Sequence, residues 1–249
     1  MKSTLDLPYV ANATNMQLMD IYLPDQGDNC DALIWFHGGG LEAGERKDAD
    51  YPKAVTDAGY AFVSVEYRMY PEAKYPEFIE DAAAAVAYAL KHLPGLGCTG
   101  KVFVSGESAG AYITMMLCMN PQFLADAGVE QSAIAGFISD SAQQFCHFNV
   151  LREMGLDGRL ERINERAPIY YVREGLALRP LLLMYYEDDM KCRPEETRLM
   201  YANLKNILPE AFVEITELPG GHCSRPRDES GDHLMIQRAL KFVQDVKAL

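Results

Sequence analysis

The chain has 249 residues, of which 49% are hydrophobic and 24% charged, so it can bury a large core without disulfides or metal ions. Its formal net charge of −13 argues against nucleic-acid binding, which needs a basic face, and against binding to anionic membrane surfaces. No apolar stretch approaches membrane-spanning length, and the N-terminal residues contain no apolar core of signal-peptide length.

The six cysteines follow no metal-binding or redox spacing. None belongs to a Cys-x-x-Cys pair, and none stands at the spacing of a zinc site. We therefore expect free thiols in a reducing compartment, and a cytoplasmic protein.

Seven short segments are rich in aliphatic, β-branched and aromatic residues and have the length of strands. They cover residues 19–24, 32–36, 60–67, 102–105, 132–139, 180–186 and 212–216. The first ends at a proline, which is typical of an edge strand. A polar turn is expected at residues 25–31.

Helical periodicity together with start and stop signals predicts helices between these strands. They cover residues 51–58, 77–93, 111–120, 194–207 and 231–249. Apolar strands that alternate with helices indicate a mostly parallel sheet covered on both faces. Residues 140–179 depart from this alternation and are predicted to be an inserted helical segment. We therefore predict a single α/β domain over residues 1–249 with a local insertion at 140–179.

The sequence Gly-Glu-Ser-Ala-Gly at residues 106–110 lies between a predicted strand and a predicted helix. In that context a G-x-S-x-G sequence forms a nucleophile elbow, a sharp turn that exposes a serine hydroxyl. The flanking glycines suit such a turn, because it strains the serine backbone and leaves no room for neighbouring side chains. Ser108 is therefore the candidate nucleophile.

A serine hydroxyl needs a base that removes its proton and an acid that orients the base. After such an elbow, the acid and then the base are expected in loops that follow later strands. Glu187, Asp188 and Asp189 directly follow one of these strands, and spacing alone does not decide between the two aspartates. His222 follows the last strand and a glycine-rich loop, so it is the candidate base.

An oxyanion that forms during acyl transfer needs backbone N–H donors. One donor is expected from Ala109, the residue after the nucleophile. The others are expected from the sequence His-Gly-Gly-Gly at residues 37–40, which ends a buried strand upstream of the elbow. Glycines at these positions let amide groups point at a substrate without side chains in the way.

Together these motifs resemble the α/β-hydrolase superfamily, and within it the hormone-sensitive-lipase-like esterases and bacterial acetyl esterases. The sequence Tyr-Arg-Met-Tyr-Pro-Glu at residues 67–72 also resembles a segment of this group, as does the stretch from Pro76 through Asp81 to Ala85. The resemblance extends from residue 19 to residue 242. It implies an α/β-hydrolase fold with a mostly parallel central sheet and a short helical insertion before the strand that bears the acid.

The resemblance also implies roles for individual residues. In the family, a proline and a glutamate follow the acid several residues later, which aligns the acid with Asp189. Tyr186 stands where the family usually has glycine. The oxyanion donors are placed on Gly39, Gly40 and Ala109.

Two departures from the family concern the substrate. A leucine stands where the family often has a bulky aromatic residue, and there is no room for the family's long N-terminal cap before residue 37. We therefore expect an open site, covered only by residues 140–179, which suits esters of bulky alcohols such as acylated sugars. The candidates for substrate contact are Leu41, Glu42, Phe145, His147 and Phe148.

The expected function is that of a serine carboxylic ester hydrolase that acts on short-acyl esters, with acylated carbohydrates as candidate substrates. Amide cleavage, as in arylformamidases or prolyl-oligopeptidase-like peptidases, uses the same motifs and is the alternative. A non-catalytic small-molecule binder is a third hypothesis. We expect a small-molecule ester as partner, no nucleic acid or membrane, and no cofactor or metal; the sequence leaves the oligomeric state open.

Overall fold

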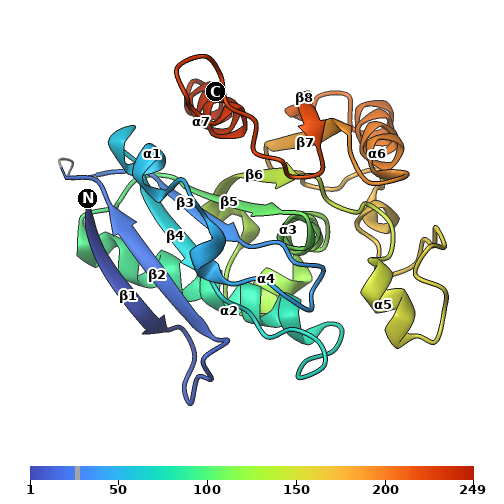
Figure 1. Cartoon of the computed structure of the whole chain (residues 1–249), viewed down its shortest axis with the longest axis horizontal. Coiled ribbons are helices and arrows are strands. Elements are labelled where there is room, and N and C mark those ends of the chain that lie inside the picture. Colours follow the sequence, from blue (N-terminus) through green and yellow to red (C-terminus); the bar gives the residue numbers. More distant parts are fainter. Residues whose placement is uncertain (26–28) are drawn as a thin grey trace.

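The structure is a computed structural model that describes residues 1–25 and 29–249 (Figure 1). Within these residues one sheet of eight strands has the order β1-β2-β4-β3-β5-β6-β7-β8. The strands are β1 (Lys2–Pro8), β2 (Leu18–Leu23), β3 (Ala32–Phe36), β4 (Ala61–Val65), β5 (Val102–Glu107), β6 (Ile134–Asp140), β7 (Leu181–Asp188) and β8 (Val213–Gly221). β1 and β2 are antiparallel to their neighbours, and all pairs from β4 to β8 are parallel, which confirms the predicted sheet type.

The helices cover the two faces of this sheet (Figure 1). α1 (Pro52–Asp57) and α7 (Leu234–Lys247) pack on one face, and α2 (Glu77–His92), α3 (Ala109–Met119) and α6 (Arg193–Ile207) pack on the other. The remaining short helices are η1 (Arg46–Asp48), η2 (Leu93–Leu96), α4 (Gln122–Asp126), η3 (Gln131–Ala133), α5 (Phe148–Glu153) and η4 (Pro168–Tyr171). No helix in the described part of the chain has the length and apolar character needed to cross a membrane.

The core has two layers, one on each side of the sheet. Along β3, Ile34 and Phe36 belong to the layer under α2 and α3, whereas Leu33 and Trp35 belong to the layer under α1 and α7. Successive side chains of a strand point to opposite faces, so a strand that is buried on both faces must be apolar throughout. This explains why the central strands appear in the sequence as continuous apolar runs.

β1 is the one strand of the described residues that the sequence analysis did not predict. All its residues except Leu7 are exposed, and its sequence KSTLDLP contains neither an apolar run nor a buried face. It forms because it pairs with β2 at the edge of the sheet, an interaction that local sequence does not encode. The polar turn predicted at residues 25–31 lies partly outside the described residues.

The predicted ends of the other elements differ from the observed ends by a few residues, most of all in β8. This strand continues to Gly221 instead of ending at residue 216. Its pairing with β7 extends through Leu218 to Gly221, although a proline and a glycine lie between them. The extension matters because it carries the chain directly to His222.

The segment between β6 and β7 contains α5 and η4, so the predicted insertion is present and only partly helical. Glu196 of α6 anchors the first residues of the insertion, because Glu196 Oε2 accepts hydrogen bonds from the N–H groups of Gln144 (2.7 Å) and Phe145 (3.1 Å). Glu153 of α5 accepts hydrogen bonds from the Tyr70 hydroxyl and from the N–H of Tyr75. The single-domain organisation stays a prediction from the sequence.

The expectation that all cysteines are free thiols is wrong for two of them. Cys30 and Cys98 form a disulfide, with their Cα atoms 4.6 Å apart. They precede β3 and β5, which lie side by side in the sheet, so the strand order brings them together. Cys118, Cys146, Cys192 and Cys223 are free.

Glu196, the buried residue that anchors the insertion, is expected to make a pH-dependent contribution to the stability of the fold. Burial raises the pKa of Glu196 above its usual range, although the charge of Arg193 acts in the opposite direction. A carboxyl with a raised pKa in the folded state stabilises the fold most below its unfolded pKa, and this contribution is lost as the pH rises through the folded pKa. In Glu196→Gln an amide oxygen remains to accept the N–H groups, but the side chain does not titrate.

We therefore expect Glu196→Gln to gain stability relative to the parent as the pH rises from about 4 to about 8, a range that starts near the ordinary glutamate pKa. Urea denaturation at each pH measures this difference in the free energy of unfolding. Glu195→Gln is the matched control, because Glu195 is exposed on the same helical turn. If the free energy of unfolding had the same pH dependence in both variants, the titration would not belong to Glu196.

Candidate active site

Ser108 occupies the sharp turn between β5 and α3. Its backbone has φ 53° and ψ −110°, a conformation that non-glycine residues rarely adopt. Its N–H donates to the carbonyl of Asp140 at the end of β6 (2.8 Å), and its carbonyl accepts from the N–H of Tyr112 in α3 (2.9 Å). The turn that the pentapeptide predicts is therefore present, and both neighbouring elements hold it.

The two glycines of the pentapeptide are required by close backbone contacts. A Cβ atom on Gly106 would lie 2.2 Å from the carbonyl oxygen of Gly110. A Cβ atom on Gly110 would lie 2.1 Å from the carbonyl oxygen of Phe36 and 2.5 Å from that of His37. The first turn of α3 thus packs directly on the end of β3, which places Ser108 beside the loop that follows β3.

The structure brings Ser108, His222 and Asp189 together from the ends of β5, β8 and β7. Ser108 Oγ lies 2.8 Å from His222 Nε2, and His222 Nδ1 lies 2.5 Å from Asp189 Oδ1. The Asp189 side chain is fully buried, whereas that of His222 is 23% exposed. Glu187 and Asp188, the other candidates for the acid, are exposed residues.

Four donors surround the Asp189 carboxylate. His222 and the N–H of Met190 (2.7 Å) approach Oδ1, while the Ser141 hydroxyl (2.6 Å) and the N–H of Tyr186 (3.1 Å) approach Oδ2. Burial pushes the pKa of Asp189 upward, but the hydrogen bonds from His222 and Ser141 outweigh it and hold the pKa below its usual value. The carboxylate therefore stays ionised beside the imidazole.

The glycine loop after β3 faces Ser108. Gly39 and Gly40 have φ 105° and 69°, in the left-handed region that glycine adopts without steric cost. A Cβ atom on Gly38 would lie 3.3 Å from the Cβ of Ser108. Ala109 is the first residue of α3, where backbone N–H groups have no partner within the helix.

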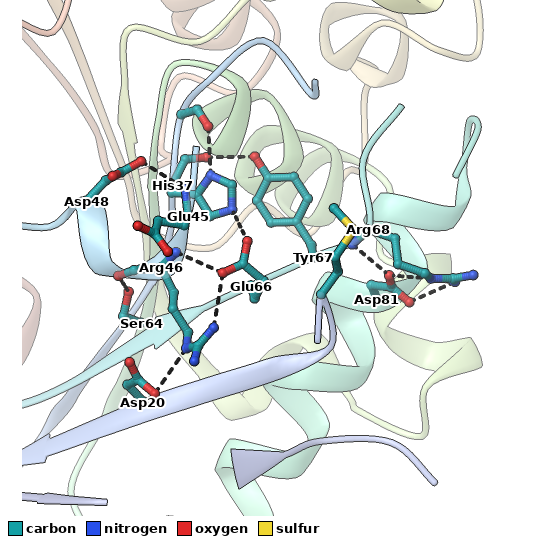
Figure 2. A network of polar contacts seen from close by, with 12 residues as sticks. Asp20, His37, Glu45, Arg46, Asp48, Ser64, Glu66, Tyr67, Arg68 and Asp81 are labelled. Carbon is teal, nitrogen blue, oxygen red and sulfur yellow. Dashed lines mark hydrogen bonds and ion pairs between the residues drawn. The ribbon is translucent and has the colours of Figure 1, made fainter. Parts of the chain in front are cut away.

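A buried polar network supports this loop from below (Figure 2). The His37 ring has Nδ1 2.7 Å from the carbonyl of Gly38 and Nε2 3.2 Å from Glu66 Oε1. Tyr67 stacks on the same ring, with 4.4 Å between ring centroids, and its hydroxyl donates to the His37 carbonyl (2.7 Å). The histidine that precedes the glycines is therefore fixed on both ring nitrogens and on one face.

Arg46 balances the negative charge in this network (Figure 2). Its backbone N–H and its Nη1 donate to Glu66 Oε2 (3.0 and 3.2 Å), and its Nε lies 3.0 Å from Asp20 Oδ1. Burial pushes the pKa of Glu66 upward, but hydrogen bonds from His37 and Arg46 hold it below its usual value. The loop thus rests on the ion pair between Glu66 and Arg46.

Glu107, the variable residue of the pentapeptide, ties the elbow to the loop that bears His222. Its two carboxylate oxygens accept from Arg225 Nε (3.0 Å) and Nη2 (3.1 Å). Arg225 also lies over the ring of Tyr51, 5.6 Å from its centroid. Because this salt bridge is bidentate, it fixes the orientation of both segments.

Glu107 also belongs to the one group within residues 1–25 and 29–249 whose geometry is compatible with a metal ion. Its carboxylate, that of Asp140 and the thiol of Cys223 offer ligand atoms within 4.8 Å of one another. However, Arg225 already balances the charge of Glu107. The pKa of Asp140 is raised well above its usual range, first by burial and then by the nearby charge of Glu107. These residues therefore favour a salt bridge beside a neutral acid over a metal centre.

Ser108 and His222 open onto a hollow of about 350 Å³. A larger hollow of about 760 Å³ adjoins it, and the two share Glu42, Phe148 and Met190 in their walls. Charged residues of both signs line the larger hollow: Glu42, Arg152, Asp157, Arg159, Glu161, Lys191, Arg193 and Glu196.

Two of the five candidates for substrate contact, Glu42 and Phe148, line both hollows. The other three line neither hollow. Leu41 is fully buried, and Phe145 packs against the core. His147 is buried as the N-cap of α5, and burial lowers its pKa well below its usual value.

Sequence analysis did not single out Ser141, Met190 or Arg225. Ser141 directly follows a buried parallel strand, and polar residues at the carboxyl ends of such strands often face the site. That position is the signal that would have identified it. Met190 and Arg225 lie in loops whose course follows from packing and not from local sequence.

The family model described as BD-FAE matches residues 19–150 of the chain, which is more than half of its 249 residues. Esterase LipI of Mycobacterium tuberculosis is 36% identical over 97 residues, covering 38% of this chain and 30% of that protein. Tuliposide A-converting enzyme 2 of Tulipa gesneriana, a chloroplastic protein, is 27% identical over 262 residues, covering 91% of this chain and 66% of that protein. The chain thus spans less than half the length of LipI.

Solved structures show the same architecture. A truncated carbohydrate esterase from gut microbiota has a TM-score of 0.82 at 16% identity, covering 100% of this chain and 97% of that one. A thermophilic esterase from Thermogutta terrifontis has a TM-score of 0.74 at 19% identity, covering 98% and 90%. These likenesses show the α/β-hydrolase fold. The family match over residues 19–150 establishes that the chain belongs to the BD-FAE family.

Proposed function

We propose that this protein hydrolyses carboxylic esters through an acyl-enzyme on Ser108. The observation that supports this most directly is the line of contacts from Ser108 Oγ through His222 to Asp189, at 2.8 and 2.5 Å. As Oγ attacks the ester carbonyl carbon, His222 Nε2 takes its proton. Asp189 keeps the ring oriented and stabilises the imidazolium that forms.

The attack converts the carbonyl oxygen into an oxyanion, which the N–H groups of Gly39, Gly40 and Ala109 stabilise. Loss of one such donor typically costs about 3 to 4 kcal/mol of transition-state stabilisation. The tetrahedral intermediate collapses as the alcohol leaves and takes the proton from His222. Water then attacks the acyl-enzyme with the same base, which releases the acid and restores the Ser108 hydroxyl.

We infer that short-acyl esters of carbohydrates suit the two hollows best. A sugar hydroxyl both donates and accepts hydrogen bonds, so it pairs with cationic and acidic side chains alike. The larger hollow offers both kinds, and Phe148 adds an apolar surface at the junction. The hollow around Ser108 is the smaller of the two, so we assign the acyl group to it and the sugar to the larger one.

A cytoplasmic location stays a prediction from the sequence. The disulfide between Cys30 and Cys98 is an observation against it, because disulfides persist mainly in oxidising compartments.

Ser108→Ala tests the proposed function. We expect hydrolysis of p-nitrophenyl acetate to fall by about 10³-fold or more, because no other group supplies the nucleophile. Circular dichroism and the melting temperature should match those of the parent. Substantial residual esterase activity would refute the assignment.

A comparison of substrates in the parent separates ester from amide hydrolysis. We expect slower rates on N-formylkynurenine and on a proline anilide than on p-nitrophenyl acetate. A faster rate on either amide would favour the amidase alternative.

The neighbouring aspartates provide a matched pair of variants. Asp189→Asn should lower kcat by about 10² to 10⁴-fold, because an amide in place of the carboxylate no longer stabilises the imidazolium. Asp188→Asn should leave kcat within about twofold, since its side chain is exposed. Steady-state kinetics on p-nitrophenyl acetate measures kcat of both variants. A larger loss of kcat in Asp188→Asn than in Asp189→Asn would identify Asp188 as the acid.

The larger hollow is tested by Arg159→Ala, because this exposed side chain lines the larger hollow and not the one around Ser108. We expect KM for an acetylated disaccharide to rise by about threefold to tenfold, the loss of one ordinary hydrogen bond, because solvent screens the charge of this exposed side chain. KM for p-nitrophenyl acetate should not change, because its leaving group is too small to need this hollow. Equal effects on both substrates would exclude the hollow as a carbohydrate site.

A further inference from the structure

One buried hydroxyl lies at the junction between Asp189 and His222. Ser141 Oγ is 2.6 Å from Asp189 Oδ2 and 3.0 Å from His222 Nδ1. The residue is fully buried and lines neither hollow near Ser108. Its contacts are therefore with the acid and the base, and not with a substrate.

The direction of these hydrogen bonds follows from the donors and acceptors present. An ionised carboxylate only accepts, so the Ser141 hydroxyl donates its hydrogen to Asp189 Oδ2. His222 Nδ1 lies 2.5 Å from Asp189 Oδ1 and donates to it, which leaves Nε2 free to accept the Ser108 proton. The lone pairs of Ser141 Oγ then face the Nδ1–H group.

We propose that Ser141 is a positioning residue that locks the Asp189 carboxylate and the His222 ring in the orientation needed for proton transfer. The inference rests on the proposed ester hydrolysis at Ser108. Without the hydroxyl, Asp189 loses the side-chain donor on Oδ2, and the Nδ1–H loses a second acceptor. The N–H groups of Tyr186 and Met190 still hold the carboxylate, but its orientation relative to the imidazole is less tightly fixed.

The backbone of Ser141 is itself held in place from two sides. It has φ 60°, in the left-handed region that is costly for a residue with a Cβ atom. Its N–H donates to the carbonyl of Met184 in β7 (2.9 Å), and its carbonyl accepts from Nη1 of Arg193 at the start of α6. Strained residues persist only where surrounding contacts over-determine them, and they cluster at functional sites.

The contact with Arg193 accounts for a buried guanidinium. Arg193 is only 3% exposed, and burial lowers its pKa despite the neighbouring charge of Glu196. A buried charge is costly unless it is paired and hydrogen-bonded. Here it fixes the carbonyl of the residue whose hydroxyl orients the acid and the base, so α6 and β7 both contribute to the placement of His222.

The test compares Ser141→Ala with Ser139→Ala in the full chain. Ser139 is a buried serine of β6, two residues before Ser141 and 1% exposed, and its hydroxyl has no hydrogen-bond partner within the described residues. We expect Ser141→Ala to lower kcat for p-nitrophenyl acetate by about tenfold to a hundredfold, the range for a lost hydrogen bond to a charged group. KM should stay within about twofold, because Ser141 does not reach the substrate. Ser139→Ala should leave both constants near those of the parent.

Ser141→Gly separates the hydroxyl from the strain, because glycine adopts the same φ without cost. We expect it to lose as much kcat as Ser141→Ala while it melts at the same temperature as the parent or higher. Recovery of kcat in the glycine variant would show that strain, and not the hydroxyl, matters, and would overturn the proposal. The same holds if Ser139→Ala loses as much activity as Ser141→Ala.

Proton NMR gives a readout that needs no turnover. The hydrogen between His222 Nδ1 and Asp189 should give a low-field resonance that moves in Ser141→Ala and stays in place in Ser139→Ala. If the parent hydrolyses no ester but the resonance moves, the proposed function fails and the positioning role stands. If the parent is an active esterase and neither kcat nor the resonance changes in Ser141→Ala, the positioning role fails and the proposed function stands.

Discussion

The contact on which the site depends is between two stretches of backbone. The first turn of α3 lies against the end of β3 so closely that a Cβ atom on Gly110 would be 2.1 Å from the carbonyl oxygen of Phe36. Only a residue without a side chain permits this approach. It sets Ser108 beside the loop of Gly39 and Gly40, so the candidate nucleophile and the candidate oxyanion donors share one rigid junction.

Buried charged pairs surround this junction and fix the segments that meet there. Arg46 pairs with Glu66 below the glycine loop, and Arg225 pairs with Glu107 between the elbow and the loop of His222. Arg193 holds the carbonyl of Ser141. A buried ion pair contributes little net stability compared with apolar packing, yet breaking one is costly, so such pairs define geometry more than they stabilise the fold.

Sequence patterns predicted those strands, helices and site residues whose signal lies within a short stretch of the chain. The apolar runs of the central strands indicate burial on both faces, because successive side chains alternate between two core layers. The exposed strand β1 carries no such pattern and forms only through its partner. Leu41 and His147 were likewise expected near a substrate. Leu41 is instead buried in the core, and His147 caps α5, whose position depends on how the insertion folds back.

The sequence by itself determined the α/β alternation, the elbow at Ser108 and the order in which acid and base follow it, because these depend on periodicity and on glycine at specific positions. Residue spacing left Asp188 and Asp189 open, and the family resemblance favoured Asp189. Only the tertiary structure decided that Asp189 lies against His222, that Cys30 meets Cys98, and that Ser141 joins the acid and the base. The physical reason is that each of these contacts links residues far apart in the chain. Strand order brings them together, and a sequence pattern does not record how strands lie side by side.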